Sequence, residues 1–206
     1  SREGAPDDYM TGYRQLGQFI PEGSKSGAAP AAVYVTHRVL PLDHAHFGIM
    51  PRQTVLAAEA FLARAQRFAQ DMAPSLNACV PFHPDSNLVC LALNPAGNLD
   101  IAEANTFVRD LYDGLRCDPR QPLQLKQFFA SITTLQRAMV GDAEMHRILR
   151  ELGIDPATME CTNTDRLVIL RHTLMNPYLV DHENGISYID RYFDYLTTHL
   201  GPPSRT

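Results

Sequence analysis

The longest regular pattern in the chain is the segment "PRQTVLAAEAFLARAQRFAQDM", residues 51–72. Its apolar side chains recur at helical spacing, at Val55, Ala58, Leu62, Ala65 and Ala69. Pro51 stands at its start, where the missing backbone N–H of proline costs least. The pattern predicts a helix over 51–72.

Short strands and further helices alternate after this helix. The patterns predict strands over 77–82, 87–93, 128–135 and 165–175, and helices over 99–115, 141–153 and 183–200, with Gly153 as a C-terminal cap. This order is typical of an α+β layer in which helices cover a short, mostly antiparallel sheet.

The first third of the chain has no predicted strand of its own. Residues 1–22 carry turn signals, and a helix is expected over 26–40, beginning near Ser24 or Ser26 with Pro30 in its first turn. Two helices without a strand look like the tail of a different domain. We therefore predict that residues 1–74 end one domain and that residues 75–206 form a second, smaller one.

Composition excludes several classes of protein. Hydrophobic residues make up 45% of the chain and charged residues 20%, which indicates a soluble globular protein. A net charge of −5 without a basic block argues against nucleic-acid binding. The sequence shows neither an apolar run long enough to span a membrane nor a signal peptide. The four cysteines form no C-x-x-C pair, which favours reduced thiols and a cytoplasmic location.

The pentapeptide "GSKSG", residues 23–27, has two interpretations. Gly23 and Ser24 before a helix could offer backbone N–H groups and a hydroxyl to a phosphate, with Lys25 supplying charge. The other interpretation is an ordinary capped helix, since the spacing is not that of a P-loop.

A second candidate site lies in "LVILRHTLMNPY", where Arg171, His172 and Thr173 interrupt an apolar strand. Polar side chains are costly when they are buried without partners. Either this end of the strand is exposed or the three side chains face a site, and spacing alone does not decide between them.

Other chemistry has weak support. The chain has only two lysines, Lys25 and Lys126, so a mechanism that needs a buried amine has few candidates. His44 and His46 lack a cysteine or acidic ligand set nearby, so surface or interface positions are expected rather than a metal site. Ser1 could mark a pyruvoyl enzyme, although a cleavage site or chain edge explains it more simply.

Four segments taken together carry a family resemblance. They are "GQFIPEGSKSGAAPAAVYVTHRVLPLDHAHFG", "HPDSNLVCLALNP", "ANTFVRDLYD" and "LVILRHTLMNPYL". In this order they resemble the C-terminal part of group II amino-acid decarboxylases that depend on pyridoxal phosphate, most closely the bacterial tyrosine decarboxylase-like branch. The resemblance runs from about Tyr13 to Leu196.

The resemblance implies a fold and a division of the chain between two domains. Family members are α/β enzymes of fold-type I and form homodimers. Residues 1–74, a loop plus two helices, would end the large cofactor domain, and residues 75–206 would be the α+β small domain. The cofactor lysine of the family lies in a His-Lys pair upstream of the "GSK" segment. No such pair occurs here, so no catalytic residue is assigned and the isolated chain is expected to be inactive.

The resemblance also implies site residues and a function. Gly23 and Ser24 would reach the cofactor phosphate of the same or of the neighbouring subunit. Arg171, His172 and Thr173 fall in the stretch that lines the substrate pocket in the family. The expected protein is the C-terminal piece of a longer decarboxylase, cleaved or separately expressed beside an N-terminal piece. It would convert a tyrosine-like amino acid to an amine and carbon dioxide.

Alternatives remain open at this point. His172 is larger than the residues expected at its position, so glutamate, diaminobutyrate or another amino acid is an alternative substrate. A different class of function is a truncated, inactive homologue that serves as a dimerisation or binding module.

Overall fold

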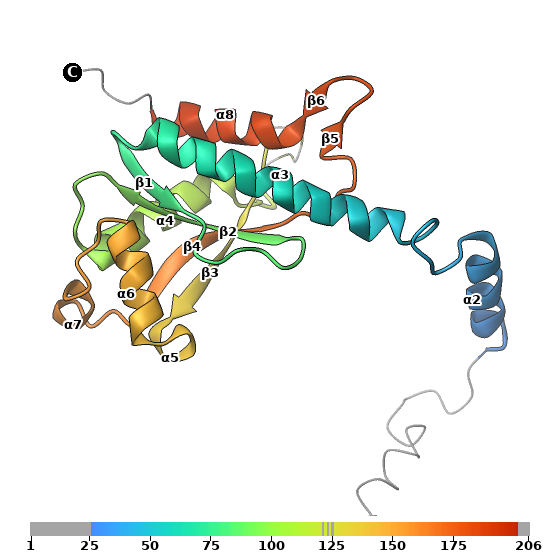
Figure 1. Cartoon of the computed structure of the whole chain (residues 1–206), viewed down its shortest axis with the longest axis horizontal. Helices are drawn as coiled ribbons and strands as arrows, with labels where there is room; N and C mark the ends of the chain where they lie inside the picture. The colour runs from blue at the N-terminus through green and yellow to red at the C-terminus, as the bar shows by residue number, and fades with distance from the viewer. Residues whose placement is uncertain (1–25, 121, 123, 125, 202–206) are drawn as a thin grey trace, which may run out of the picture. The chain divides into compact units, whose positions relative to one another are not determined.

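The computed structural model describes residues 26–201, except 121, 123 and 125 (Figure 1). Ser1, Gly23, Ser24 and Lys25 therefore lie outside the described residues. The chain separates into two compact units, residues 1–49 and residues 50–206. This separation lies earlier than the predicted one after residue 74, because the long helix packs in the second unit. As parts of a complete enzyme, the ranges 1–74 and 75–206 stay a prediction.

The described part of the first unit contains the helix α2 (Ala28–Val39), close to the predicted 26–40. The backbone N–H of Ala28 donates to Oγ of Ser26 over 3.2 Å, but the N-cap residue is Gly27, and no side chain caps it. Pro30 lies in the first turn, as expected. None of the residues of α2 is buried within this chain.

The second unit is built on an antiparallel sheet. Its strands are β1 (Leu76–Cys79), β2 (Leu88–Pro95), β3 (Ser131–Gln136) and β4 (Arg166–Thr173), in the order β1-β2-β4-β3. Every pairing is antiparallel. This confirms the mixed architecture with a small antiparallel sheet that the sequence predicts.

Helices cover both faces of this sheet. On one face α3 (Ile49–Met72) and α8 (Tyr188–Leu200) lie side by side, and Phe61, Phe68 and Phe193 pack between them and the strands (Figure 1). The other face meets α6 (Asp142–Glu151) and the short α7 (Thr158–Cys161), through Met145 and Ile148 among others. A one-turn helix, α5 (Arg137–Val140), follows β3. Burial of these two apolar layers is the main stabilising contribution.

The helix α4 (Ile101–Leu115) fills a gap between two strands of the sheet. Strand β2 pairs with β4 only at its beginning, so the first half of β4 lacks a strand partner on that side. The side chain of Asn105 replaces this partner: its Nδ2 donates to the carbonyl of Arg166 over 2.9 Å, and its Oδ1 accepts from the N–H of Val168 over 2.7 Å. Asn105 thus satisfies buried backbone groups that a strand would otherwise pair.

Three predicted boundaries are wrong by three residues or more: β1 ends at Cys79 and not at residue 82, β3 begins at Ser131 and not at residue 128, and the start of the last helix is furthest off. The last helix begins at Tyr188 and not at residue 183, because a small hairpin of β5 (Val180–Asp181) and β6 (Ile186–Ser187) comes first. Gly185 takes a φ of 65° in the turn, a conformation that disfavours a continuing helix. The hydroxyl of Ser187 accepts from the N–H of Asp190 over 3.1 Å and caps α8.

The predicted cap of α6 is confirmed. Gly153 has a φ of 72°, and the N–H of Ile154 donates to the carbonyl of Leu149 over 2.8 Å, which is the pattern of a Schellman motif. Among the helices of the described residues, none is long and apolar enough to cross a bilayer.

Candidate functional site

A cavity of about 430 Å³ lies at the end of β4. Arg171, His172 and Thr173 all border it, so the structure brings the three predicted residues together. Much of the wall is aromatic and comes from α3, from the segment before β3 and from α8, through Phe61, Phe128, Phe129, Tyr188 and Tyr192. A concave, mostly apolar space with a few polar groups is the usual form of a small-molecule site.

The three predicted residues contribute to the cavity in different ways. Successive side chains of a strand point to opposite faces, and along β4 Arg171 and Thr173 are exposed while His172 between them is 8% exposed. His172 points into the layer that α3 and α8 cover. Part of this strand end is therefore exposed, and His172 faces the cavity.

His172 is held by two hydrogen bonds. Its Nδ1 lies 3.3 Å from the carbonyl oxygen of Val89, and its Nε2 lies 2.7 Å from the hydroxyl of Tyr192. A carbonyl only accepts, so Nδ1 carries the hydrogen of a neutral ring and Nε2 accepts from the tyrosine. The ring also packs 4.7 Å from that of Phe61, centroid to centroid.

Burial determines the charge of this pair. Burial lowers the pKa of His172 to about 4, although the hydrogen bond to Val89 acts to raise it. Burial also raises the pKa of Tyr192 well above its ordinary value. Both groups are therefore neutral at physiological pH, and the cavity wall carries a hydrogen-bonded pair without net charge.

Arg171 lies at the rim of the cavity. Its Nε donates to Oγ of Ser131 over 3.1 Å, and the same hydroxyl donates to the carbonyl of Arg171 over 3.0 Å. The two residues are register partners in β4 and β3. Because its partner here is a hydroxyl and not a carboxylate, the guanidinium charge is not neutralised by this contact.

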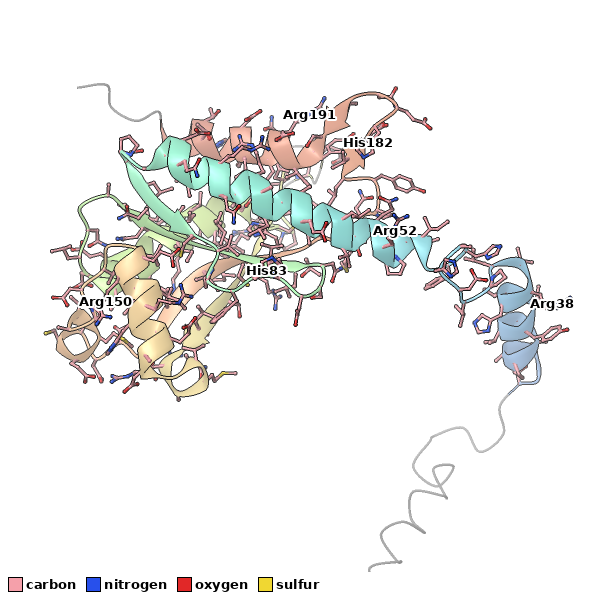
Figure 2. All side chains as sticks on the ribbon, viewed as in Figure 1. Arg38, Arg52, His83, Arg150, His182 and Arg191 are labelled. Carbon is pink, nitrogen blue, oxygen red and sulfur yellow. The ribbon has the colours of Figure 1, made fainter. Side chains whose placement is uncertain are left out.

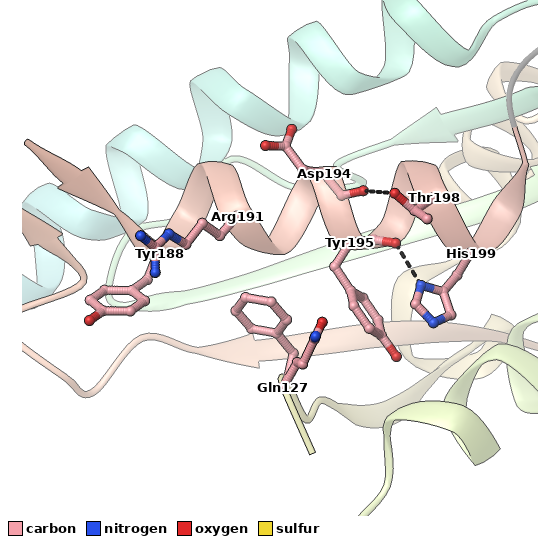
Figure 3. Close-up of a pocket in the computed structure, with 8 residues that line it drawn as sticks. Gln127, Tyr188, Arg191, Asp194, Tyr195, Thr198 and His199 are labelled. Atoms are coloured by element: carbon pink, nitrogen blue, oxygen red, sulfur yellow. Dashed lines mark hydrogen bonds between the residues drawn. The ribbon is translucent and has the colours of Figure 1, made fainter. Parts of the chain in front are cut away.

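A larger hollow of about 710 Å³ lies along the outer side of α8 (Figure 3). Its side chains mostly contact one another or the helix: the guanidinium of Arg191 lies 5.4 Å from the ring centre of Tyr188, and Nδ1 of His199 bonds to the carbonyl of Tyr195 over 2.9 Å. Arg191, like Arg52 and Arg150, is exposed on its helix (Figure 2). Arg171, His172 and Thr173, the predicted site residues that the structure describes, do not border this hollow, so the cavity at β4 is the better candidate.

An aldehyde cofactor is anchored by a lysine amine, and one lysine lies among the described residues. Lys126 is the single lysine among them, and its Nζ donates to the carbonyl of Gly114 at the end of α4. It does not border the cavity at β4. Of the candidate metal ligands, His46 has its Nδ1 2.7 Å from a carboxylate oxygen of Asp43, and no group of three possible ligands occurs in the described ranges.

The sequence did not indicate the partner of His172. The predicted ranges place Tyr192 within the helix 183–200 and Phe61 within the helix 51–72, and nothing in the sequence joins either residue to His172. A tyrosine on a buried helix face does need a partner for its hydroxyl, which is the one signal that could have pointed to this pair.

Comparison with known proteins identifies relatives of this chain. Residues 65–200 match the family described as "Tyrosine decarboxylase, C-terminal". The chain is 27% identical over 186 residues to L-tyrosine decarboxylase of Enterococcus faecium, and 26% identical over 186 residues to that of Levilactobacillus brevis. Each alignment covers 90% of this chain but 28% of the relative, so the chain spans little more than a quarter of their length.

Proposed function

Because the chain belongs to the tyrosine decarboxylase C-terminal family, we propose that it forms the C-terminal part of an L-amino-acid decarboxylase that depends on pyridoxal phosphate. The substrate would be a tyrosine-like aromatic amino acid, converted to its amine and carbon dioxide. The names of the relatives and their greater length support this proposal.

The observation that carries the proposal is the aromatic cavity at the end of β4. It would accept the ring of the substrate between Phe61 and Phe128, since aromatic rings pack well against one another. Arg171 and Thr173 at the rim would offer a charge and a hydroxyl to the polar end of the substrate. The role of the chain is then to bind and orient the substrate and to exclude water from its ring.

The cofactor would be held mainly by the preceding part of the enzyme. Pyridoxal phosphate supplies an electron sink for the pair left behind when carbon dioxide departs. Its anchoring lysine would lie upstream, because Lys126 is bonded to Gly114. Gly23 and Ser24 remain proposed phosphate contacts. A cytoplasmic homodimer is part of the same proposal, and all four cysteines are free thiols, as a reducing compartment favours.

Amine release by the complete enzyme tests this function. With pyridoxal phosphate added, the enzyme is expected to release tyramine from tyrosine faster than it releases any amine from glutamate or diaminobutyrate. Borohydride reduction should then attach the cofactor to a lysine upstream of this chain. Amine release from glutamate or diaminobutyrate alone would favour the alternative substrates.

A non-enzymatic role is the second candidate. The position of Lys126, bonded away from the cavity, favours it for the isolated chain. In that case the complete protein would release no amine from any amino acid, and this chain would still self-associate or bind a partner. Attachment of the cofactor to Lys25 or Lys126 after borohydride treatment would contradict both accounts.

A further inference from the structure

Tyr192 borders the cavity at the end of β4, and its hydroxyl bonds to the buried His172. We infer that Tyr192 is a specificity-determining residue, which favours substrates whose ring carries a hydrogen-bond donor over substrates with a plain phenyl ring. This inference rests on the proposed function, and it names the feature of the ring that the cavity recognises.

The first step concerns the hydrogen of His172. The carbonyl of Val89, on the neighbouring strand, can only accept, so Nδ1 of the neutral ring carries the hydrogen. Nε2 is therefore an acceptor, and the Tyr192 hydroxyl 2.7 Å away must donate to it. A tyrosine has one hydroxyl hydrogen, and here it is already used.

The second step concerns what remains of the Tyr192 hydroxyl. Its oxygen still has a lone pair, so toward a ligand it can accept a hydrogen bond but cannot donate one. Tyr192 borders the cavity together with Phe61 and Phe128, whose ring centres lie 6.0 Å and 5.5 Å from its own. These two neighbours are hydrocarbon and cannot compete for the same bond.

The third step follows from the cost of an unpaired polar group. A phenol or aniline ring in this cavity would donate to the Tyr192 oxygen. A phenyl ring of nearly the same size would exclude water and leave that oxygen without a donor, which is costly in a buried site. We therefore expect kcat/KM for tyrosine to be about tenfold or more higher than kcat/KM for phenylalanine.

The test compares three substrates in the complete enzyme: tyrosine, 4-aminophenylalanine and phenylalanine. In Tyr192→Phe the preference for the two donor-bearing rings should fall by about tenfold, with the phenylalanine rate changing least. This variant leaves Nε2 of His172 as a possible acceptor, so the double variant with His172→Leu should remove the preference further. Tyr195→Phe is the matched control, because Tyr195 lies one turn along α8 and borders the other hollow.

The outcomes separate the inference from the proposed function. The inference is wrong if Tyr192→Phe and the double variant keep the wild-type ratio of kcat/KM for tyrosine to kcat/KM for phenylalanine, or slow all three substrates equally. The decarboxylase activity would still stand in that case. If the wild-type enzyme releases no amine from any aromatic amino acid, the proposed function fails and the inference fails with it. A fall of the ratio in Tyr192→Phe but not in Tyr195→Phe supports the inference.

Discussion

The hydroxyl oxygen of Tyr192 lies 2.7 Å from Nε2 of His172, and this bond joins the last helix to strand β4 beside the cavity. Both residues are buried, and both lie within the range that matches the family. The pair therefore serves two purposes. It satisfies two polar groups in an apolar layer, and under the inference above it also determines how the Tyr192 oxygen bonds to a substrate.

The stability of the chain should depend on pH through His172. The pKa of this ring is lowered from 6.5 to about 4 by burial, so the unfolded chain takes up a proton at a higher pH than the folded chain does. The free energy of unfolding should fall as pH drops from about 6.5 to about 4, and this group alone contributes a loss of about 3 kcal/mol. Urea unfolding at a series of pH values measures it.

Substitution isolates this contribution from that of the carboxylates. His172→Gln removes the titrating ring and should flatten the curve between pH 6.5 and pH 4, relative to the control His83→Gln in the exposed loop between β1 and β2. Parallel curves for the two variants would show that burial of His172 is not linked to folding in this way.

Asn105 should contribute strongly to stability. In Asn105→Ala the carbonyl of Arg166 and the N–H of Val168 lose their partner, and we expect a loss of about 2–4 kcal/mol. Thr106→Ala is the control: it removes an exposed hydrogen bond to the carbonyl of Ala102 and should change stability by less than about 0.5 kcal/mol. Equal losses in urea unfolding would mean that the gap beside β4 closes without Asn105.

Two glycines should respond to alanine with opposite signs. At Gly153 the φ is 72° and an added Cβ would lie 2.8 Å from Nδ2 of Asn77, so Gly153→Ala should destabilise the chain by about 1–2 kcal/mol or more. Gly114 lies in α4 with nothing within 4 Å of a Cβ, so Gly114→Ala should stabilise it by about 1 kcal/mol. Thermal unfolding of both variants would show melting temperatures that shift in opposite directions, and shifts of the same sign would contradict this account.

Local patterns predicted the regular elements well. The apolar spacing from Val55 to Ala69 located α3 within two residues at its N-terminus. The face was predicted less well, because the buried side of α3 runs through Phe61 and Phe68 while Val55 is 41% exposed. The hairpin before α8 was missed because its strands have two residues each, too few to show an alternation. There Ile186 fits the helical pattern that continues with Ile189, and Gly185 alone marks the turn.

The features that depend on distant residues could not be predicted. The predicted range places Asn105 within the helix 99–115, and its role follows from where β2 and β4 separate. Tyr192 meets His172 across 20 positions of sequence. That Arg171, His172 and Thr173 lie at a cavity was one of two open interpretations. The sequence could not decide between them, because α3 and α8 as well as the sheet enclose this cavity.

The most direct test of the account is to fill the cavity at the end of β4 in the complete enzyme. Ala130 borders this cavity, whereas Ala138 is exposed on α5 and does not. The measurement is kcat/KM for tyrosine in Ala130→Trp and in Ala138→Trp. We predict a loss of about tenfold or more for Ala130→Trp, expressed largely in KM, and near wild-type values for Ala138→Trp. Equal values in the two variants would contradict the claim that this cavity holds the substrate.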